Sequence, residues 1–356
     1  MTTTIDLNEE KLQAFLERAF ADLAASYGGV MVSLGDKLGL YRSLAGAGPL
    51  TSAELAERAG CAERYVREWL GSQVAAAYVD YDPAAETYEL PAEHAAVLAD
   101  PDSPTLLTPA YNVPASMWVD EEQAVRAFRT GEGVPWGAHD ERLACGVAAL
   151  YRNAYSGALV PQWLPALDGV TEHLERGARV ADIGCGHGHS TVLMAEAFPN
   201  STFVGVDPHE ASIAAAIENA AAAGVSDRVS FAVGTAADSR EQGFDLICFF
   251  DALHDMGDPV GAARHARSAL AEDGTVMLVE PYAADRLEDT NGPIGRLYYS
   301  ASTTLCCAHA LSEGGQDVLG AQAGEARLAD VFAEAGFTHW RLAEQTPFNL
   351  ILEARA

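Results

Sequence analysis

The feature that most constrains this chain is the stretch VADIGCGHGHS, residues 180–190. An apolar run typical of a strand ends there in three alternating glycines, Gly184, Gly186 and Gly188, and a helical pattern follows at once. Glycine lacks Cβ and accepts positive φ, so a ligand can lie against bare main chain. A helix start adds free N–H groups. Because ligands of open α/β sheets bind beyond the carboxyl ends of strands, the stretch predicts a binding loop at such an edge.

The residues around this loop alternate between short apolar runs and helical stretches, which predicts an α/β fold with a mainly parallel sheet. At the C-terminal end a helical pattern precedes two apolar runs, joined by a link too short for a parallel crossover. We therefore expect the last strand to be antiparallel. The expected strands are RVADIG (179–184), TFVGVD (202–207), VSFAVG (229–234), FDLICFF (244–250), GTVMLVE (274–280), THWRLAEQ (338–345) and NLILEAR (349–355).

The N-terminal part of the chain has a different character. Leu12, Leu16 and Phe20 belong to an apolar stripe at helical spacing. A capping-box signature, Thr51 with Glu54, opens a later helix. Two further segments read as another helix and a hairpin, which together predict a mainly α winged-helix domain. We expect this domain at 1–100, for dimerisation, then a helical linker and lid at 101–178 and a ligand-binding domain at 179–356.

Two acidic residues narrow the choice of ligand for the glycine loop. Asp207 ends the second predicted strand, 19 residues after Gly188, where a carboxylate can accept both hydroxyls of an adenosine ribose. Asp182 lies just before the first glycine, where it can hold a cationic amine, directly or through water, and would repel a pyrophosphate. The dinucleotide fingerprint also needs a third glycine where this chain has His189. S-adenosylmethionine, which has an amino acid tail and no phosphate, fits this pattern better than a dinucleotide does.

These segments resemble class I S-adenosylmethionine-dependent methyltransferases of the small-molecule type that carry an N-terminal winged-helix domain. VADIGCGHG is similar to their first motif, FVGVD to their ribose-binding strand end, and FDLICFFDALHDMGDP to their fourth motif. The resemblance implies a Rossmann-like seven-stranded methyltransferase sheet with the last strand antiparallel. It also implies S-adenosyl-L-methionine as cofactor and a cofactor-binding set comprising Asp182, Gly184, Gly186, Gly188, Asp207, Pro208, Thr235, Ala236, Phe250 and Asp251.

The same resemblance suggests which residues act on the acceptor. His254, just past the fourth strand, is expected on the rim of the site as the base, with Glu280 as the acid that orients it. The alternative is a histidine that only shapes the cofactor loop. The aromatic residues Tyr111, Trp118, Trp136 and Tyr155 are weaker candidates for an apolar acceptor pocket, since each is also consistent with plain core packing.

Charge sets the expected partners. The 51 acidic and 22 basic residues give a formal net charge of −29, which disfavours nucleic acid and anionic membranes. The start of the chain has no basic stretch followed by an apolar one, so we expect a cytoplasmic protein. C-G-H-G-H at 185–189 crowds too many ligands on one loop for a metal site, and none is expected.

The sequence leads us to expect a methyltransferase that acts on a small, apolar or aromatic molecule, with O-methylation favoured and the active form a homodimer. Two alternatives stay open. One is a nicotinamide-dependent oxidoreductase, which the position of His189 disfavours. The other is a winged-helix regulator that senses S-adenosylmethionine without catalysis, which the acidic balance disfavours.

Overall fold

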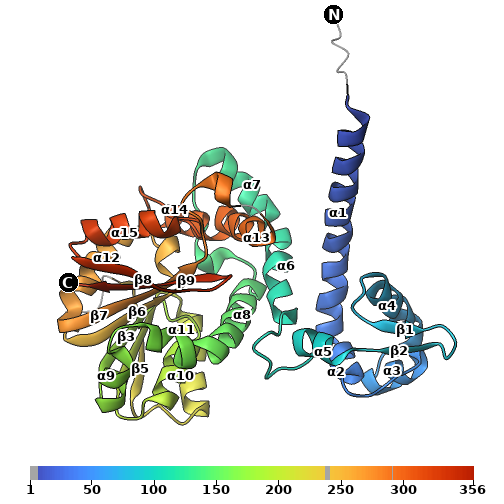
Figure 1. The fold of residues 1–356 in the computed structure, drawn as a ribbon, viewed down its shortest axis with the longest axis horizontal. Coiled ribbons are helices and arrows are strands. Elements are labelled where there is room, and N and C mark those ends of the chain that lie inside the picture. The colour runs from blue at the N-terminus through green and yellow to red at the C-terminus, as the bar shows by residue number, and fades with distance from the viewer. Residues whose placement is uncertain (1–6, 237–240, 291) are drawn as a thin grey trace, which may run out of the picture. The chain divides into compact units, whose positions relative to one another are not determined.

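The computed structural model describes residues 7–236, 241–290 and 292–356 (Figure 1). The first six residues, part of the start on which the expected location rests, lie outside the described residues. The chain divides into two compact units, residues 1–115 and 116–356, which we describe separately. The division expected near residues 100 and 178 stays a prediction. Among the described helices, none has the length and apolar character needed to cross a bilayer.

The N-terminal unit has the predicted winged-helix layout, in which helices precede a two-stranded antiparallel hairpin. The capping box is present, because the Thr51 hydroxyl accepts from the Glu54 N–H while Glu54 accepts from the Thr51 N–H at 2.8 Å. Its elements are α1 (Glu9–Lys37), α2 (Leu40–Leu44), α3 (Ser52–Ala59), α4 (Glu63–Ala75), β1 (Asp80–Asp82), β2 (Thr87–Glu89), α5 (Ala92–Leu98) and η1 (Thr108–Tyr111).

Helix α1 contains the predicted apolar stripe, but most of that stripe is exposed. Phe15, Phe20 and Tyr27 are each exposed by more than 60%. Only Val32 and Gly35, near the end of the helix, are buried. The core of this unit instead forms between α2, α3 and α4, around side chains such as Tyr41 and Trp69, whose rings lie 5.0 Å apart. Most of the stripe on α1 therefore takes no part in the core of this unit.

The second unit opens with helices before the sheet begins. Helix α6 (Asn112–Val119) crosses the division between the units. The elements that follow it are α7 (Glu121–Thr130), η2 (Trp136–Ala138), α8 (Arg142–Ala158), η3 (Leu159–Trp163), η4 (Leu164–Ala166) and α9 (Val170–Arg176).

The sheet of this unit has seven strands in the order β5-β4-β3-β6-β7-β9-β8. Strand β9 alone runs antiparallel to its neighbours, as predicted, and the other described pairs are parallel. The strands are β3 (Arg179–Ile183), β4 (Thr202–Asp207), β5 (Val229–Val233), β6 (Phe244–Phe250), β7 (Leu270–Pro281), β8 (His339–Gln345) and β9 (Asn349–Arg355). The helical elements between them are α10 (His189–Ala197), α11 (Glu210–Ala222), η5 (Leu253–Asp255), α12 (Pro259–Ala269), η6 (Leu287–Asp289), α13 (Pro293–Ala301), η7 (Ser302–Cys306), α14 (Cys307–Ser312) and α15 (Gly324–Glu334).

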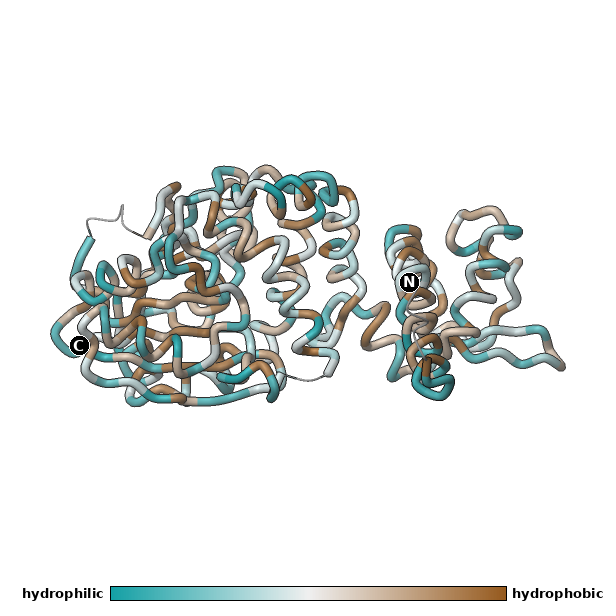
Figure 2. Tube along the Cα trace, turned by 90° about the horizontal axis from the view of Figure 1, so that it is seen from above, coloured by the Kyte–Doolittle hydropathy of each residue, from teal (hydrophilic) through white to brown (hydrophobic). Residues whose placement is uncertain are grey.

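Both faces of the sheet are covered, which explains why its central strands are apolar along their whole length. In β6, Leu246 and Cys248 point to one core, shared with α8, α10 and α11, while Ile247 and Phe249 point to the other, shared with α12 and α15. Figure 2 shows the hydrophobic strand segments inside this unit, between more polar helices. The two cores fix the sheet, and with it the carboxyl ends of β3, β4, β5 and β6.

Gly188 is required by packing at the start of α10. Its φ is +71°, and a Cβ there would lie 2.7 Å from the Phe231 ring and 2.9 Å from Ala216. The residue is buried and does not line the cavity described below. The expectation that Gly188 contacts the ligand is therefore wrong, because its missing side chain makes room for strand β5 and helix α11.

We predict that Gly188→Ala lowers the free energy of unfolding by about 2–3 kcal/mol, from backbone strain together with overpacking. Gly224→Ala is the matched control, because its φ is +70° but a Cβ added there would have no atom within 4 Å. The control is expected to cost only about 1 kcal/mol. Denaturant unfolding of both variants measures the difference, and equal losses would show that packing at Gly188 is unimportant.

Candidate functional site

A cavity of about 580 Å³ lies at the carboxyl ends of strands β3 to β6. The glycine loop after β3 forms one wall, and the residues after β4, β5 and β6 form the next. Helix α8, the segment around Trp136 and the end of α14 complete the lining. The sheet thus places the predicted loop at the opening of a cavity large enough for a small molecule.

The glycine loop presents bare main chain to this cavity. Gly184 and Gly186 both line it, with φ of +75° and +52°. A Cβ on Gly184 would lie 2.5 Å from the Cβ of Ala252, whereas no atom lies within 4 Å of that position on Gly186. The space beside Gly186 is therefore open for a ligand, while Gly184 allows the loop to approach the end of β6.

Asp207 lies opposite the loop and is held in place by it. Its Oδ2 accepts from the Gly186 N–H and its Oδ1 from the His209 N–H, both at 2.9 Å. Each carboxylate oxygen keeps further acceptor capacity toward the cavity. Such a carboxylate is well placed to accept hydrogen bonds from the two adjacent hydroxyls of a ribose.

The next residues continue the same wall. Pro208, Thr235 and Ala236 all line the cavity, as expected. The Gly234 N–H donates to the Asp207 carbonyl at 3.1 Å and so closes the ends of β4 and β5. A planar base attached to a ribose at Asp207 would lie against this part of the wall.

Asp182 does not reach the cavity. Its carboxylate is fully buried, and Oδ2 accepts from the Ser190 and Thr191 hydroxyls at 2.7 and 2.6 Å. Burial raises the pKa of Asp182 to about 6, although these two hydrogen bonds act in the opposite direction. The structure therefore does not support a direct contact of Asp182 with an amine, and a contact through water stays a prediction. The two hydrogen bonds anchor the first turn of α10 from beneath the loop.

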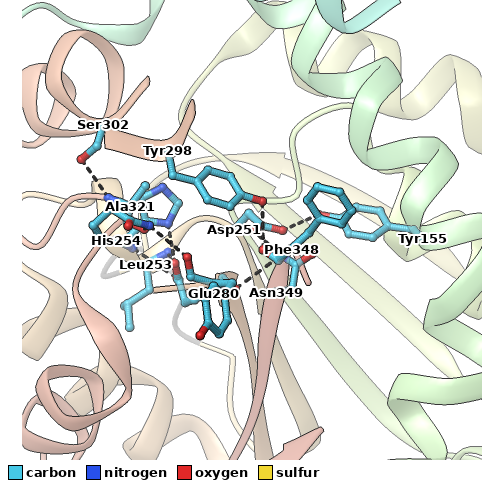
Figure 3. A network of polar contacts seen from close by, with 12 residues as sticks. Tyr155, Asp251, Leu253, His254, Glu280, Tyr298, Ser302, Ala321, Phe348 and Asn349 are labelled. Carbon is cyan, nitrogen blue, oxygen red and sulfur yellow. Dashed lines mark hydrogen bonds and ion pairs between the residues drawn. The ribbon is translucent and has the colours of Figure 1, made fainter. Parts of the chain in front are cut away.

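Strand β6 ends in Phe250 and Asp251, and both side chains line the cavity as expected. Asp251 has a φ of +50°, unusual for a residue with a side chain. Asn349 Nδ2 donates to its Oδ1 at 2.9 Å, and the Tyr155 hydroxyl to its Oδ2 at 3.4 Å (Figure 3). Burial and the nearby Glu280 raise the pKa of Asp251 to about 8.

His254 and Glu280 form a buried pair behind this wall. The His254 Nδ1 is hydrogen-bonded to Glu280 Oε2, while Glu280 Oε1 accepts from the main-chain N–H groups of Leu253 and His254 (Figure 3). The imidazole is also hydrogen-bonded with the Cys306 thiol. Burial alone would lower the pKa of His254, but Glu280 and Cys306 hold it well above its ordinary value.

The structure therefore contradicts the expected position of His254 on the rim of the site. The residue is only 4% exposed and does not line the cavity, and neither does Glu280. In this position the ring is bonded to Glu280 and Cys306, behind the wall of the cavity. The role of His254 as the base and the alternative, a histidine that only shapes the cofactor loop, both stay predictions.

The four aromatic candidates divide into two pairs. Trp136 and Tyr155 line the cavity. Tyr111 belongs to the N-terminal unit, where its ring packs against Gly29, and Trp118 is 68% exposed. Neither of these two is among the lining residues. For Tyr111 and Trp118 the proposed acceptor role is therefore not supported.

Several lining residues were missed by the sequence analysis. His309 and Glu313, at the end of α14, lie across from the loop, and the His309 Nδ1 accepts from the Trp136 N–H at 3.3 Å. Tyr151 stacks on Tyr155, with ring centroids 5.6 Å apart. The signal for Tyr151 was its spacing of four residues from Tyr155 along one helix, while nothing in the sequence connects His309 with Trp136.

Two histidines of the glycine loop, His187 and His189, also line the cavity, with rings 6.2 Å apart. Burial lowers the pKa of both, to about 4 for His189. Both are therefore neutral at physiological pH. The lining thus contains neutral imidazoles, aromatic rings and carboxylates, and none of the described lining residues is a lysine or arginine.

Comparison with known proteins gives two family matches along the chain. Residues 26–100 match the family described as the Rv2258c-like winged HTH domain, and residues 174–336 match a methyltransferase domain family. The trans-aconitate 2-methyltransferase of Variovorax paradoxus is 36% identical over 110 residues. That match covers 30% of this chain and 40% of the relative, so the chain spans well under half of that protein.

Solved structures resemble the chain over nearly its whole length. Human N-acetylserotonin methyltransferase, in complex with S-adenosylmethionine, aligns with a TM-score of 0.71 and 17% identity over 100% of this chain and 99% of its own. Mitomycin 7-O-methyltransferase aligns with a TM-score of 0.69 and 21% identity over 98% and 100%. The fold is shared with both, and the chain consists of a winged helix-turn-helix domain followed by a methyltransferase domain, which confirms the resemblance found in its sequence.

Proposed function

We propose that this protein transfers a methyl group from S-adenosylmethionine to a small, apolar or aromatic acceptor. The observation that carries the proposal is the bare loop at Gly186 bonded to Asp207 across one cavity. When bound there, S-adenosylmethionine supplies a methyl group that is already electrophilic. The protein then has mainly to align the acceptor, since proximity alone can supply much of the acceleration.

The strand order supports the fit of this donor. From β5 through β4 to β3 and β6, the cavity is bordered in turn by Ala236, Asp207, Gly186 and Asp251. A base, a ribose and an amino acid tail follow each other in the same order in the donor. Gly184 and Gly186 would thus line the methionine part, and Asp207 would hold the ribose.

A dinucleotide fits the same cavity less well. Its pyrophosphate would lie along the loop, close to the carboxylates of Asp207 and Asp251. The helix that should receive the phosphates begins at His189, a residue with a side chain where the dinucleotide fingerprint has its third glycine. These features argue against the oxidoreductase alternative.

The regulator alternative requires a winged helix that reads DNA. Helix α4 occupies the position of a recognition helix, but its two arginines are paired within the helix. Arg64 bonds to Glu68 at 2.6 Å and Arg67 to Glu63 at 2.7 Å. A DNA-binding helix needs a free basic face. We therefore infer that nucleic acid is not a partner of this domain.

The charge of the cavity restricts the acceptor. The described lining has five carboxylates, Asp207, Asp251, Asp255, Asp258 and Glu313. Asp251, with a pKa of about 8, is mostly protonated at neutral pH, but no described lysine or arginine lines the cavity to balance the other four acids. An acceptor with carboxylates of its own would therefore be repelled. The acceptor in the name of the Variovorax relative is trans-aconitate, a polycarboxylate, so we infer a different, uncharged acceptor here.

Methylation on oxygen is supported by the solved neighbours, one of which is named as an O-methyltransferase.

We also infer that the active form is a homodimer joined through α1. Leu16, Phe20, Leu23, Tyr27, Val30 and Leu34 are each more than 40% exposed. They follow one another at alternating spacings of four and three residues, which is the seam of a coiled coil. A second copy of the same helix is the partner that such a self-complementary seam fits best.

The donor proposal predicts that the purified protein binds S-adenosylhomocysteine, the demethylated donor, while NAD shows no saturable binding. Asp207→Ala is expected to weaken this binding by about 100-fold, because two ribose hydrogen bonds to a charged group are lost. Isothermal titration calorimetry measures both. Asp227→Ala, an exposed acid outside the cavity, serves as the control. Saturable binding of NAD, with none of S-adenosylhomocysteine, would reject the proposed function.

The acceptor proposal is tested by two probes that differ only in charge, 2-naphthol and 6-hydroxy-2-naphthoate. With the protein saturated in S-adenosylhomocysteine, we expect the neutral probe to bind at least about tenfold more tightly, because the acidic wall repels the carboxylate. The preference should shrink in about 0.5 M salt, where charges are screened. Equal or tighter binding of the naphthoate would show that the cavity accepts anions.

The dimer proposal predicts that Leu23→Glu yields monomers at micromolar concentration, because it places a charge in the middle of the seam. Ala25→Glu adds the same charge on the opposite face of α1 and is expected to leave the dimer intact. Sedimentation velocity distinguishes the two states. A monomeric wild-type protein, or a dimeric Leu23→Glu variant, would show that α1 is not the interface.

A further inference from the structure

Asp251 is placed by strand order next to the methionine part of the proposed donor site. It ends β6, which pairs with β3, the strand that leads into the glycine loop. Its neighbour Ala252 lies against Gly184, so the side chain faces the cavity beside that glycine. Because Asp207 marks the ribose and the loop at Gly184 and Gly186 lines the methionine part, the methionine part extends from Asp207 along the loop toward Asp251. The sulfur of the donor belongs to the methionine part.

The protein fixes this carboxylate firmly. Asp251 stays at a φ of +50°, and its N–H donates to the Val279 carbonyl at 2.7 Å. The Asn349 amide and the Tyr155 hydroxyl hold the two carboxylate oxygens from strand β9 and helix α8 (Figure 3). A residue kept in a strained conformation by several partners is a common feature of a binding site.

The charges around Asp251 do not balance it. Glu280 on β7 is a second acid close by, and the cation nearest to both, His254 on η5, is bonded to Glu280. Tyr151 and Tyr155 on α8 and Tyr298 on α13 are uncharged at neutral pH, since burial raises the pKa of each. No described lysine or arginine lines the cavity. A carboxylate in such surroundings is stabilised by a ligand that brings a positive charge.

The methyl donor brings that charge and its product does not. S-adenosylmethionine has a sulfonium, and S-adenosylhomocysteine has a neutral thioether, while their ammonium, carboxylate, ribose and adenine groups are the same. We propose that Asp251 is the residue that distinguishes the two, by pairing its carboxylate with the sulfonium. This rests on the proposed function and adds to it a means of retaining the donor and releasing the spent product.

Ionisation of Asp251 predicts the direction in which affinity for the donor changes with pH. Its pKa of about 8 means that the carboxyl is mostly protonated at pH 6.5 and mostly ionised at pH 8.5. A sulfonium favours the ionised form, so affinity for the donor rises with pH over this interval. A neutral thioether does not favour the ionised form, so affinity for the product does not rise with pH. His189, whose pKa is lowered to about 4, stays neutral over this interval, and burial lowers the pKa of His187 as well. Asp255, with a pKa of about 6, ionises mainly below this interval.

The experiment is calorimetric titration of both ligands into the full-length protein at pH 6.5, 7.5 and 8.5. We expect the ratio of donor to product affinity to increase by about tenfold across this range. Asp251→Asn, which keeps the shape and most of the hydrogen bonds, should flatten the ratio. Asp255→Asn removes a carboxylate of the same cavity farther along the chain and should preserve the increase.

A constant ratio in the wild-type protein overturns the proposal without any variant, even if Asp251→Asn fails to fold. Loss of the increase in both variants also overturns it, because the effect then belongs to the overall charge of the cavity. Equal weakening of both ligands in Asp251→Asn would place the carboxylate at the shared ammonium instead. If neither ligand binds at any pH, the proposed function itself fails.

Discussion

The site depends on one hydrogen bond, from the Gly186 N–H to the Asp207 carboxylate at 2.9 Å. It joins the loop after β3 to the end of β4 and fixes both relative to the sheet. Without a Cβ at Gly186, the main chain can turn its N–H toward the acid and still leave open space on its other side. The position of the Asp207 carboxylate and the open space beside Gly186 therefore both follow from the conformation of this glycine. The remaining walls of the cavity are arranged around them.

A second constraint comes from the surroundings of this bond. Three carboxylates, of Asp182, Asp251 and Asp255, are buried enough that the pKa of each is raised, to about 6, 8 and 6. Their roles differ because their partners differ. Two hydroxyls of α10 occupy Asp182 beneath the loop, whereas Asp251 and Asp255 line the cavity. Charge that the protein leaves unbalanced at a cavity wall selects for a positively charged ligand and against an anionic one.

The sequence predicted the sheet well, because strands buried on both faces appear as unbroken apolar runs with turn residues between them. The bounds of β4, β6 and β9 agree with those runs to the residue. The loop and Asp207 were also predictable, since glycine spacing and an acid at a strand end are local signals. The turn after β6 was not predictable: η5 directs His254 inward, toward Cys306 about fifty residues later, and no local pattern encodes that contact. Tyr155 and Tyr111 could not be told apart for the same reason.

The inward turn of His254 places its ring behind the cavity wall, away from the rim where it was expected to act on the acceptor. Glu280 receives the His254 ring and two main-chain N–H groups, so the pair fixes the turn that leads away from Asp251. A histidine bonded in this way to a buried acid holds the turn after β6 from behind the cavity wall. Asp251, the strained residue held by Asn349 and Tyr155, is one of the acids that line the cavity. The buried pair thus holds the turn that follows Asp251, while the side chain of Asp251 itself lines the cavity.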